Sequence, residues 1–484
     1  MQTERIQQRI EMKLLQSGFT SLLFILLVGM TLTVATIGYV ASVKTIQSSA
    51  VTTHAQTQAQ MQTMIGYQAL SEFLKSSNMD LANIQATSTG TVTSTSGSTI
   101  KYQKSSNCPT GAGNYCFDII GESGGAKAIL RALFKITDSV SSSTATGSIF
   151  AGGLIVGGNA SFKGAAGENV GIQTGGANAG IVTDTAGKTV TLSGISVTPF
   201  TGDINVPSAT SLRPYANYIF TKNTAGTVAT CFKNNLHSGT TDIISEAPIT
   251  CPSGVTLNNG VWTFDSSLAN LAGIIWFDGN TILQLNLTPN DYVNSVITTG
   301  TIETQLPKGN NAGTYNAYAT HHYLLTNVTD ANIKARLLKV CPADNYPLQY
   351  CQTYNATNRS LITSLQYFKD NKLTFIKDTT TYPTSLANIL FLTDIGFTMD
   401  AANNTTMNFY GNIMGSKAAG GTGGASGKIT GTGDINIRGN IVVTGSFITE
   451  MQGNMDVILG NSEASGNSIP VTVKSVIPAS ISYQ

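Results

Sequence analysis

The longest uninterrupted apolar stretch of the chain lies near its amino terminus. No residue from Leu14 to Val43 carries a charge. As an α-helix rising 1.5 Å per residue, the segment from Phe19 to Val43 would be about 37 Å long, enough to cross a bilayer core of roughly 30 Å. Because only a helix satisfies its own backbone hydrogen bonds in lipid, the pattern predicts one membrane-spanning helix over 19–43.

Charges on either side of this stretch predict its orientation. Arg5, Arg9 and Lys13 precede it, whereas Lys44 follows it and the next charged residue is Glu72. Lys and Arg near a span tend to remain on the cytoplasmic side. We therefore expect the amino terminus in the cytoplasm and the chain after Lys44 outside.

Helical spacing continues beyond this span. Residues 46–68 contain no proline and are rich in Gln, Ala and Met, so the helix is expected to cover 19–74. Its apolar residues fall on two neighbouring faces, Met64, Tyr67, Leu70 and Leu74 on one and Met61, Ile65 and Ala69 on the other. Such a wide stripe indicates packing against a sheet, and a plain stalk helix is the alternative.

Short strands are predicted over 75–138. Apolar runs at 100–103, 116–120 and 126–134 are separated by turn residues, among them the pair Gly124-Gly125. A Ser/Thr-rich segment at 139–146 then indicates a domain boundary.

Beyond that boundary, short Val/Ile/Leu runs alternate with Gly, Asn and Thr. The pattern covers 148–159, 171–183 and 189–197 and returns over 429–459. Such strands suit a parallel β-solenoid, and a β-sandwich remains the alternative. We therefore expect an α+β protein whose mainly β passenger has two parts, 139–304 and 386–484.

Residues 305–385 differ from the passenger on both sides. They are rich in tyrosine, contain the adjacent His321 and His322, and show helical spacing over 331–340 and 359–368. We predict an inserted subdomain, with the two histidines exposed in a loop.

Composition narrows the function. Only 11% of the 484 residues are charged and the net charge is +1, so the basic stripe of a nucleic-acid binder is absent.

The six cysteines are Cys108, Cys116, Cys231, Cys251, Cys341 and Cys351. In an exported segment they predict disulfides whose pairing the sequence cannot fix, although three local bridges are the simplest choice.

Motifs for catalysis are not found. The acidic residues Asp278, Asp291, Asp370, Asp400 and Asp434 are scattered, whereas a carbohydrate-cleaving enzyme on a membrane anchor would need them along one groove. We expect no catalytic, cofactor-binding or metal-binding residues and no enzymatic activity.

The amino-terminal region resembles a known family. A basic leader, Gly18-Phe19-Thr20 and a long apolar helix resemble a type IV prepilin, an ordinary signal anchor being the alternative. More loosely, residues 117–134 and Gln68-Ala69-Leu70 resemble PilX-type minor pilins. The resemblance implies that a prepilin peptidase cuts after Gly18 and methylates Phe19, so that residues 1–18 are a leader.

The resemblance also implies a cellular role. The family usually has Glu at the fifth mature position, where this chain has Leu23. We expect a minor pilin at the tip of a type IV pilus that primes assembly and displays the passenger for adhesion. Its partners would be major and minor pilins, the prepilin peptidase, the inner membrane and a separate tip adhesin where one exists. A single-pass membrane-anchored adhesin and a pseudopilin of a secretion filament are the alternatives.

Overall fold

The computed structural model divides the chain into two compact units. The first contains Met1–Thr137 and Ser475–Gln484, and the second Asp138–Lys474. Along the sequence, the second unit is therefore inserted into the first. This differs from the predicted passenger boundary, because residues 475–484 belong to the first unit.

The structure describes residues 2–75, 89–95, 97–111, 113–144, 147–165, 170–175, 181–183, 188–200, 206–238, 241–265, 271, 273–285, 291–305, 313–325, 329–341, 345–351, 354–355, 360–361, 373–374, 381–401, 404–416, 426–444, 449–460 and 468–484.

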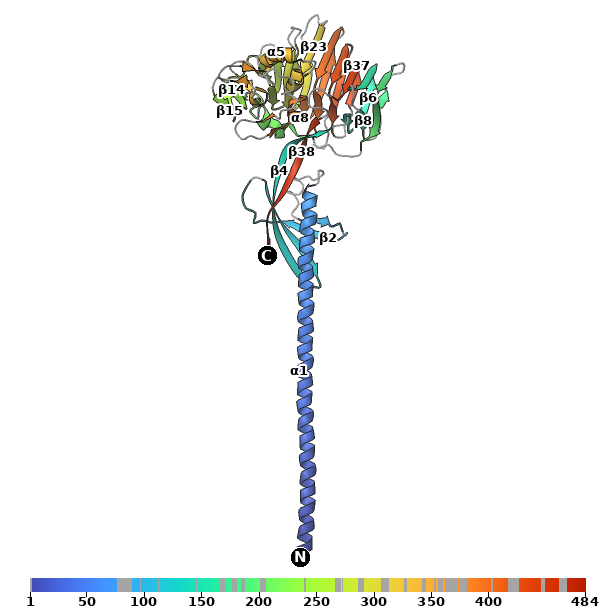
Figure 1. Ribbon diagram of the computed structural model, residues 1–484, viewed down its shortest axis with the longest axis vertical. Helices are drawn as coiled ribbons and strands as arrows, with labels where there is room; N and C mark the ends of the chain where they lie inside the picture. The colour runs from blue at the N-terminus through green and yellow to red at the C-terminus, as the bar shows by residue number, and fades with distance from the viewer. Residues whose placement is uncertain are drawn as a thin grey trace. The chain divides into compact units, whose positions relative to one another are not determined.

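Helix α1 is one continuous element from Gln2 to Lys75 (Figure 1). Its many Ser and Thr residues do not interrupt it, because their hydroxyls donate to carbonyls one turn earlier. Thr33 Oγ1 donates to Gly29 O at 2.6 Å and Thr36 Oγ1 to Leu32 O at 2.7 Å. The predicted helix over 19–74 is thus present and ends one residue later.

An antiparallel sheet accompanies the carboxyl-terminal part of α1. It contains β1 (Thr89–Thr93), β2 (Thr99–Lys104), β3 (Asn114–Ser123), β4 (Ala126–Thr144) and β38 (Ser468–Tyr483), in that order. The predicted turn between β3 and β4 is made by Gly124 and Gly125, with φ of +53° and +81°. The segment 139–144, predicted as a linker, instead continues strand β4.

The first unit has its own apolar core. Leu70 and Leu74 of α1 are fully buried against Ile119, Leu130 and Phe134 of the sheet. Disulfide Cys108–Cys116 ties the segment before β3 to that strand.

The second unit is built from parallel strands in three ladders. Ladder 1 has the order β12 (Tyr218–Lys222), β19 (Gly273–Phe277), β21 (Tyr292–Thr298), β29 (Ile389–Thr393), β32 (Asn412–Gly415), β35 (Ile441–Val443), β5 (Gly147–Phe150), β8 (Val170–Thr174) and β11 (Ile195–Pro199).

Ladder 2 has the order β18 (Val261–Asp265), β20 (Thr281–Gln284), β22 (Thr301–Gln305), β30 (Gly396–Ala401), β33 (Ser426–Gly431), β36 (Thr449–Gln452), β6 (Leu154–Gly157) and β9 (Ile181–Thr183).

Ladder 3 starts from the first residues of β21 and continues with β23 (Gly313–Tyr318), β31 (Thr405–Tyr410), β34 (Asp434–Arg438), β37 (Asn454–Leu459), β7 (Ala160–Gly164) and β10 (Val190–Ser193).

The chain visits the ladders in rotation, and together they form a nearly closed parallel arrangement. Strands β29, β30 and β31 lie in ladders 1, 2 and 3, and the next three strands repeat the cycle. The first strands of the unit pair with its last strands, since Ala160 of β7 lies opposite Met455 of β37. Both ends of the inserted chain therefore lie next to each other within the ladders and not at opposite ends.

Glycines allow the chain to turn between ladders. At Gly439, with φ of +146°, a Cβ would lie 2.2 Å from the carbonyl oxygen of Gly411 in the neighbouring strand connection. At Gly453, with φ of +116°, a Cβ would lie 2.5 Å from Gly431 O. Larger residues cannot adopt this backbone or fit this spacing, which accounts for part of the high glycine content.

Antiparallel strands cover one end of the ladders. Strand β13 (Ala229–Lys233) pairs with β12, β16 (Ala247–Ile249) pairs with β13, and β17 (Val255–Asn258) pairs with β18. Disulfide Cys231–Cys251 holds this cap together. Capping protects strand edges that would otherwise pair with other chains.

Ladder 1 is covered on its outer face as well. Ile219, Trp276 and Leu392 belong to a second apolar core, and the Trp276 indole donates to Ala209 O at 2.7 Å. The covering elements are α3 (Ala209–Leu212), the 3₁₀ helix η1 (Arg213–Tyr215), α4 (Thr320–Leu325), α5 (Asp330–Val340), α6 (Leu348–Cys351) and α8 (Thr384–Ala387). Burial on both faces explains the uninterrupted apolar runs of these strands.

Short strands accompany these helices. They are β14 (Leu236–Ser238), β15 (Thr241–Ile243), β24 (Tyr346–Pro347), β25 (Tyr354–Asn355), β26 (Ser360–Leu361), β27 (Leu373–Thr374) and β28 (Thr381–Tyr382).

The predicted insertion over 305–385 is therefore only partly separate. Strand β23 belongs to ladder 3, so the helical segment starts at Thr320. The predicted helix over 331–340 is present as α5, and disulfide Cys341–Cys351 follows it. Most of the helix predicted over 359–368 lies outside the described residues, and its described part, Ser360–Leu361, is a strand. All three local disulfide pairings expected from the sequence are present.

The prediction that His321 and His322 are exposed in a loop is wrong. Both lie in helix α4 with 2% of their surface exposed, because α4 packs between α5, α8 and ladder 1. Burial lowers the pKa of His321 to about 4, and burial together with the positive charges of His321, Arg438 and Arg336 lowers that of His322 to about 3. The pair is a neutral part of the passenger core.

This burial predicts an acid-sensitive passenger. Below about pH 6.5 the unfolded chain protonates these imidazoles while the folded chain does not, so stability falls as the pH drops. From about pH 7 to about pH 5, the free energy of unfolding should decrease by about 2–4 kcal/mol. Denaturant titrations can follow Trp262 and Trp276, both in the second unit.

The double variant His321→Phe/His322→Phe should have a flatter pH dependence, whatever its absolute stability. The exposed His54, in the first unit, provides the control substitution His54→Gln. Equal pH slopes in wild type and the double variant would contradict the assignment.

Candidate functional site

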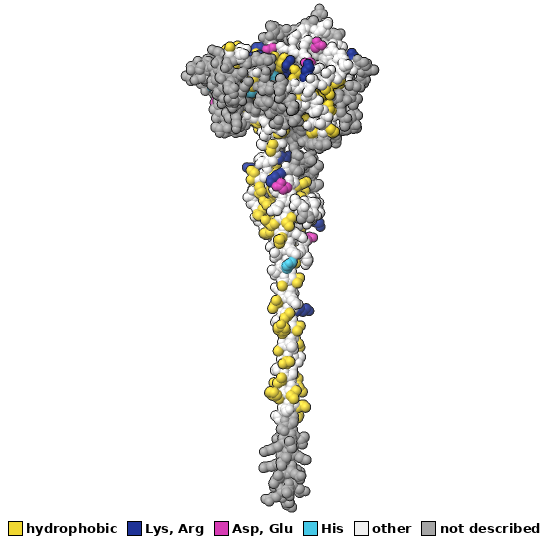
Figure 2. Space-filling view, turned by 45° about the vertical axis from the view of Figure 1, so that its right-hand side comes forward, with side chains coloured by type: hydrophobic (Ala, Val, Ile, Leu, Met, Phe, Trp, Pro, Cys, Tyr) yellow, Lys and Arg dark blue, Asp and Glu magenta, His cyan; other side chains and the backbone are white. Residues whose placement is uncertain are grey.

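Residues 19–43 of α1 form an apolar surface that no other described element covers. The side chains of Phe19, Phe24 and Tyr39 are 68%, 68% and 71% exposed. Figure 2 shows apolar side chains along the visible face of this part of the helix. Among the described helices, α1 is the one long and apolar enough to cross a membrane.

The Gly18-Phe19 bond lies inside this helix. Cleavage there would leave a helix of 57 residues, Phe19–Lys75. Leu23 lies one turn after Phe19 on the same face, and its side chain is 53% exposed. Nothing in the structure tests cleavage, methylation or the role of Leu23, which stay predictions.

The carboxyl half of α1 packs on the sheet through small residues. The buried positions are Ala55, Ala59, Thr63, Gly66, Leu70, Ser71 and Leu74, of which Leu70 and Leu74 are the two large residues. Leu70 and Leu74 are buried as the sequence predicts, whereas Met64 of the same predicted face is 37% exposed. Met61 is instead 59% exposed and Ile65 37% exposed. The missed signal was the spacing of small residues by three or four positions.

Close backbone approach explains this choice of residues. A Cβ on Gly121 of β3 would lie 2.1 Å from the carbonyl oxygen of Ala59. A Cβ on Gly66 would lie 2.6 Å from Ile100 Cγ2. Helix and strand can therefore meet at this distance only because both positions are glycine.

Polar contacts fix the register of this packing. The backbone N–H of Glu122 donates to Gln62 Oε1 at 3.0 Å, and Ser123 Oγ donates to Gln58 Oε1 at 2.7 Å. The close contact at Gly121 and the hydrogen bonds to Glu122 and Ser123 therefore fix the position of the β3–β4 turn against α1.

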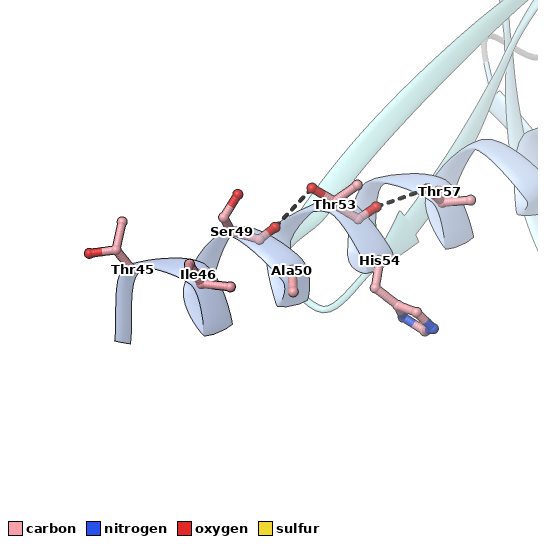
Figure 3. A pocket seen from close by; sticks show the side chains of 7 residues that line it. All are labelled: Thr45, Ile46, Ser49, Ala50, Thr53, His54 and Thr57. Carbon is pink, nitrogen blue, oxygen red and sulfur yellow. Dashed lines mark hydrogen bonds between the residues drawn. The ribbon is translucent and has the colours of Figure 1, made fainter. Parts of the chain in front are cut away.

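A hollow along α1 offers no enclosed site. Its lining residues are Thr45, Ile46, Ser49, Ala50, Thr53, His54 and Thr57 (Figure 3). All belong to the one helix, and the Thr53 and Thr57 hydroxyls donate to the helix's own carbonyls at 2.8 and 2.9 Å. A small-molecule pocket needs walls from several elements, whereas this surface suits lipid or another helix.

A second groove lies between α1 and β38. Gln60, Met61, Met64 and Ile65 of the helix line it together with Tyr483 of the strand. The Tyr483 hydroxyl lies 3.5 Å from both Thr63 Oγ1 and Gln60 O. The exposed methionines therefore form the rim of an open groove.

Two of the acidic residues considered for catalysis accept hydrogen bonds from neighbouring side chains. Asp278 accepts from Thr299 Oγ1 at 3.3 Å, and Asp291 accepts from Asn316 Nδ2 at 3.1 Å. Asp370 lies outside the described residues. Within the part of the chain that is described, no three His, Cys, Asp or Glu side chains are grouped to hold a metal ion.

Comparisons with known proteins do not show a family for this chain. No protein-family model matches the chain, and no curated protein matches it. Among solved structures, the competence-associated pilin ComZ from Thermus thermophilus is similar at 11% identity, covering 89% of this chain and 98% of that one. The TM-score of 0.24 is too low for this likeness to support an argument.

The close approach of α1 and β3 yields a prediction. Gly121→Val should separate helix from strand at a cost of about 1–3 kcal/mol or more, because its Cβ would overlap the Ala59 carbonyl. Amide hydrogen exchange should accelerate over 55–74 and 114–123, while unfolding followed by the two tryptophans stays unchanged. Gly38→Val, where a Cβ meets no atom within 4 Å, is the steric control. Unchanged exchange in Gly121→Val would refute the close packing.

Proposed function

We propose that this chain is a prepilin-like minor pilin that assembles at the tip of a type IV pilus and displays the passenger for adhesion. One observation carries the proposal. The single helix α1 has an uncharged, exposed amino half directly after Gly18-Phe19, and its carboxyl half is packed on an antiparallel sheet. A plain membrane anchor has no need of that second half.

We propose further that the second unit is a β-solenoid, in which each passage of the chain through ladders 1, 2 and 3 is one coil and each ladder is one face. Parallel pairing in every ladder and rotation of the chain through ladders 1, 2 and 3 support this view over an antiparallel sandwich. A solenoid whose first and last strands are neighbours can be inserted between β4 and β38 without disturbing either strand's role in the first unit.

Leu23 supports the tip position. A subunit with Glu at this place could pair it with the amino group of a neighbour in an apolar filament core, where an unpaired charge costs several kcal/mol. Leu23 has no carboxylate and so no electrostatic need for a preceding subunit. The size of the second unit also supports the tip position, because a domain covering Asp138–Lys474 would crowd a helical lattice if it were repeated in every subunit.

The mechanism is binding and assembly, without catalysis or cofactors. Before assembly the protein would lie in the inner membrane with its amino terminus in the cytoplasm, and afterwards in the extracellular pilus. Its partners would be other pilins and the prepilin peptidase.

The tip position predicts a labelling pattern. Immunogold against the passenger on sheared pili should label one end of each filament, and deletion of the protein should reduce the number of pili. A Leu23→Glu variant should enter the shaft and spread the label along it. Label distributed along wild-type shafts would exclude the tip position, and label only on cell membranes would favour an anchored adhesin.

A further inference from the structure

The outer face of ladder 3 presents two ordered groups of polar side chains. Tyr315, Ala317, Met407 and Phe409 point into the core and are buried. Because side chains alternate along a strand, residues 316, 318, 408, 410, 436 and 438 point outward. They are half-buried or exposed.

The first group, the amide row, consists of Asn316, Asn408 and Asn436 at equivalent positions of β23, β31 and β34. Asn436 Nδ2 donates to Asn408 Oδ1 at 2.8 Å, and Asn408 Nδ2 donates to Asn316 Oδ1 at 2.8 Å. An amide has two N–H donors and two acceptor lone pairs, so hydrogen-bonding capacity remains toward solvent. The amide row repeats this hydrogen-bonding capacity from strand to strand, at a spacing of about 4.8 Å.

The second group, the tyrosine–cation cluster, starts two residues further along the same strands. The rings of Tyr318 and Tyr410 stack at 4.3 Å and an angle of 7°. The Arg438 guanidinium lies over the Tyr410 ring at 5.9 Å. The ring faces are thereby covered, while the exposed Arg438 is directed to solvent beside the amide row.

Helix α4 supplies Tyr323 to the cluster, and helix α5 supplies Arg336 and Lys339. Tyr323 contacts the Tyr318 ring at 5.2 Å, and Arg336 and Lys339 lie over Tyr323 at 4.9 and 5.5 Å. Lys339 also approaches Asp291 at 3.8 Å, and its side chain is 41% exposed.

The cluster is positively charged on a weakly charged surface. The cluster contains three cations, Arg336, Lys339 and Arg438, and one carboxylate, that of Asp291. A second carboxylate, Asp434, lies four residues before Arg438 on the same face of β34. Among the coloured residues of the second unit in Figure 2, few side chains are charged. Three cations against one carboxylate favour a negatively charged ligand at this cluster, while Asp456 opposite Asn436 is paired with Lys163 at 3.1 Å.

We propose that the amide row and the tyrosine–cation cluster together bind an anionic polysaccharide carrying carboxylate or sulfate groups. Amides at regular spacing suit successive sugar hydroxyls, and the cations suit the acid groups. The proposal names a ligand class for the adhesive passenger and rests on the proposed function only for its extracellular location.

Nucleic acid is less compatible with this surface. Base stacking needs free aromatic faces, and those of Tyr318 and Tyr410 face each other. Phosphate backbones also require more cations than this cluster supplies.

The test uses the purified full chain in non-ionic detergent. Biolayer interferometry measures binding to polygalacturonate, dextran sulfate, neutral dextran and double-stranded DNA, each at about 50 and 200 mM salt. We expect binding to at least one of the two anionic polysaccharides, weakened by salt, and clearly weaker binding to neutral dextran and DNA. Polygalacturonate and dextran sulfate distinguish carboxylate from sulfate recognition.

Two variants test the residues. Lys339→Gln/Arg438→Gln should weaken binding about tenfold by removing two exposed charges. The isosteric Asn408→Asp places a negative charge in the amide row and should also weaken it. Lys428→Gln, which removes an exposed cation from ladder 2, is the matched control and should bind as wild type does. Tryptophan fluorescence verifies that each variant is folded.

Several results would overturn the proposal. These are equal binding of neutral and anionic polysaccharides, equal loss in Lys428→Gln, or tighter binding to DNA that the same variants abolish, which would indicate a nucleic-acid site. Failure of the pilus assignment is separate: the protein would be missing from sheared pili while the purified chain still bound the polysaccharide.

Discussion

The structure depends on one helix that must satisfy two environments. Residues 19–43 of α1 expose an uncharged apolar surface whose contact with water is unfavourable, so lipid or other helices are expected to cover it. The carboxyl half is covered by the chain's own sheet, at a separation that only Gly66 and Gly121 permit. Because α1 is continuous, whatever holds its amino half also positions the β3–β4 turn that its carboxyl half contacts.

The passenger is a large insertion in the sequence of a smaller unit. Parallel ladders let the first strands of the insertion pair with its last, as Ala160 does with Met455. The entry and exit of the chain thereby lie close together, which is what an insertion between two paired strands requires. The antiparallel cap with Cys231–Cys251 protects one end, and buried helices cover ladder 1. Ladder 3 is left with an ordered polar face.

Much of this could be predicted from the sequence because the signals were local. Uncharged length predicted the helix, Gly124-Gly125 the turn, and cysteine proximity the disulfides. What failed depended on tertiary packing. His321-His322 was predicted to be exposed in a loop, yet α5 and α8 pack against the helix that contains it. The tyrosine–cation cluster joins residues from β23, α4, α5, β31 and β34, which no local pattern connects.

The central claim is that α1 becomes the amino-terminal helix of an assembled pilin. Intact mass and amino-terminal sequencing of the protein from cells with an active prepilin peptidase test it most directly. The account predicts a mature chain that begins at a methylated Phe19, with Gly18→Ala leaving the leader attached. A chain that retains Met1 in the presence of the peptidase, or one cut after residue 43, would contradict it.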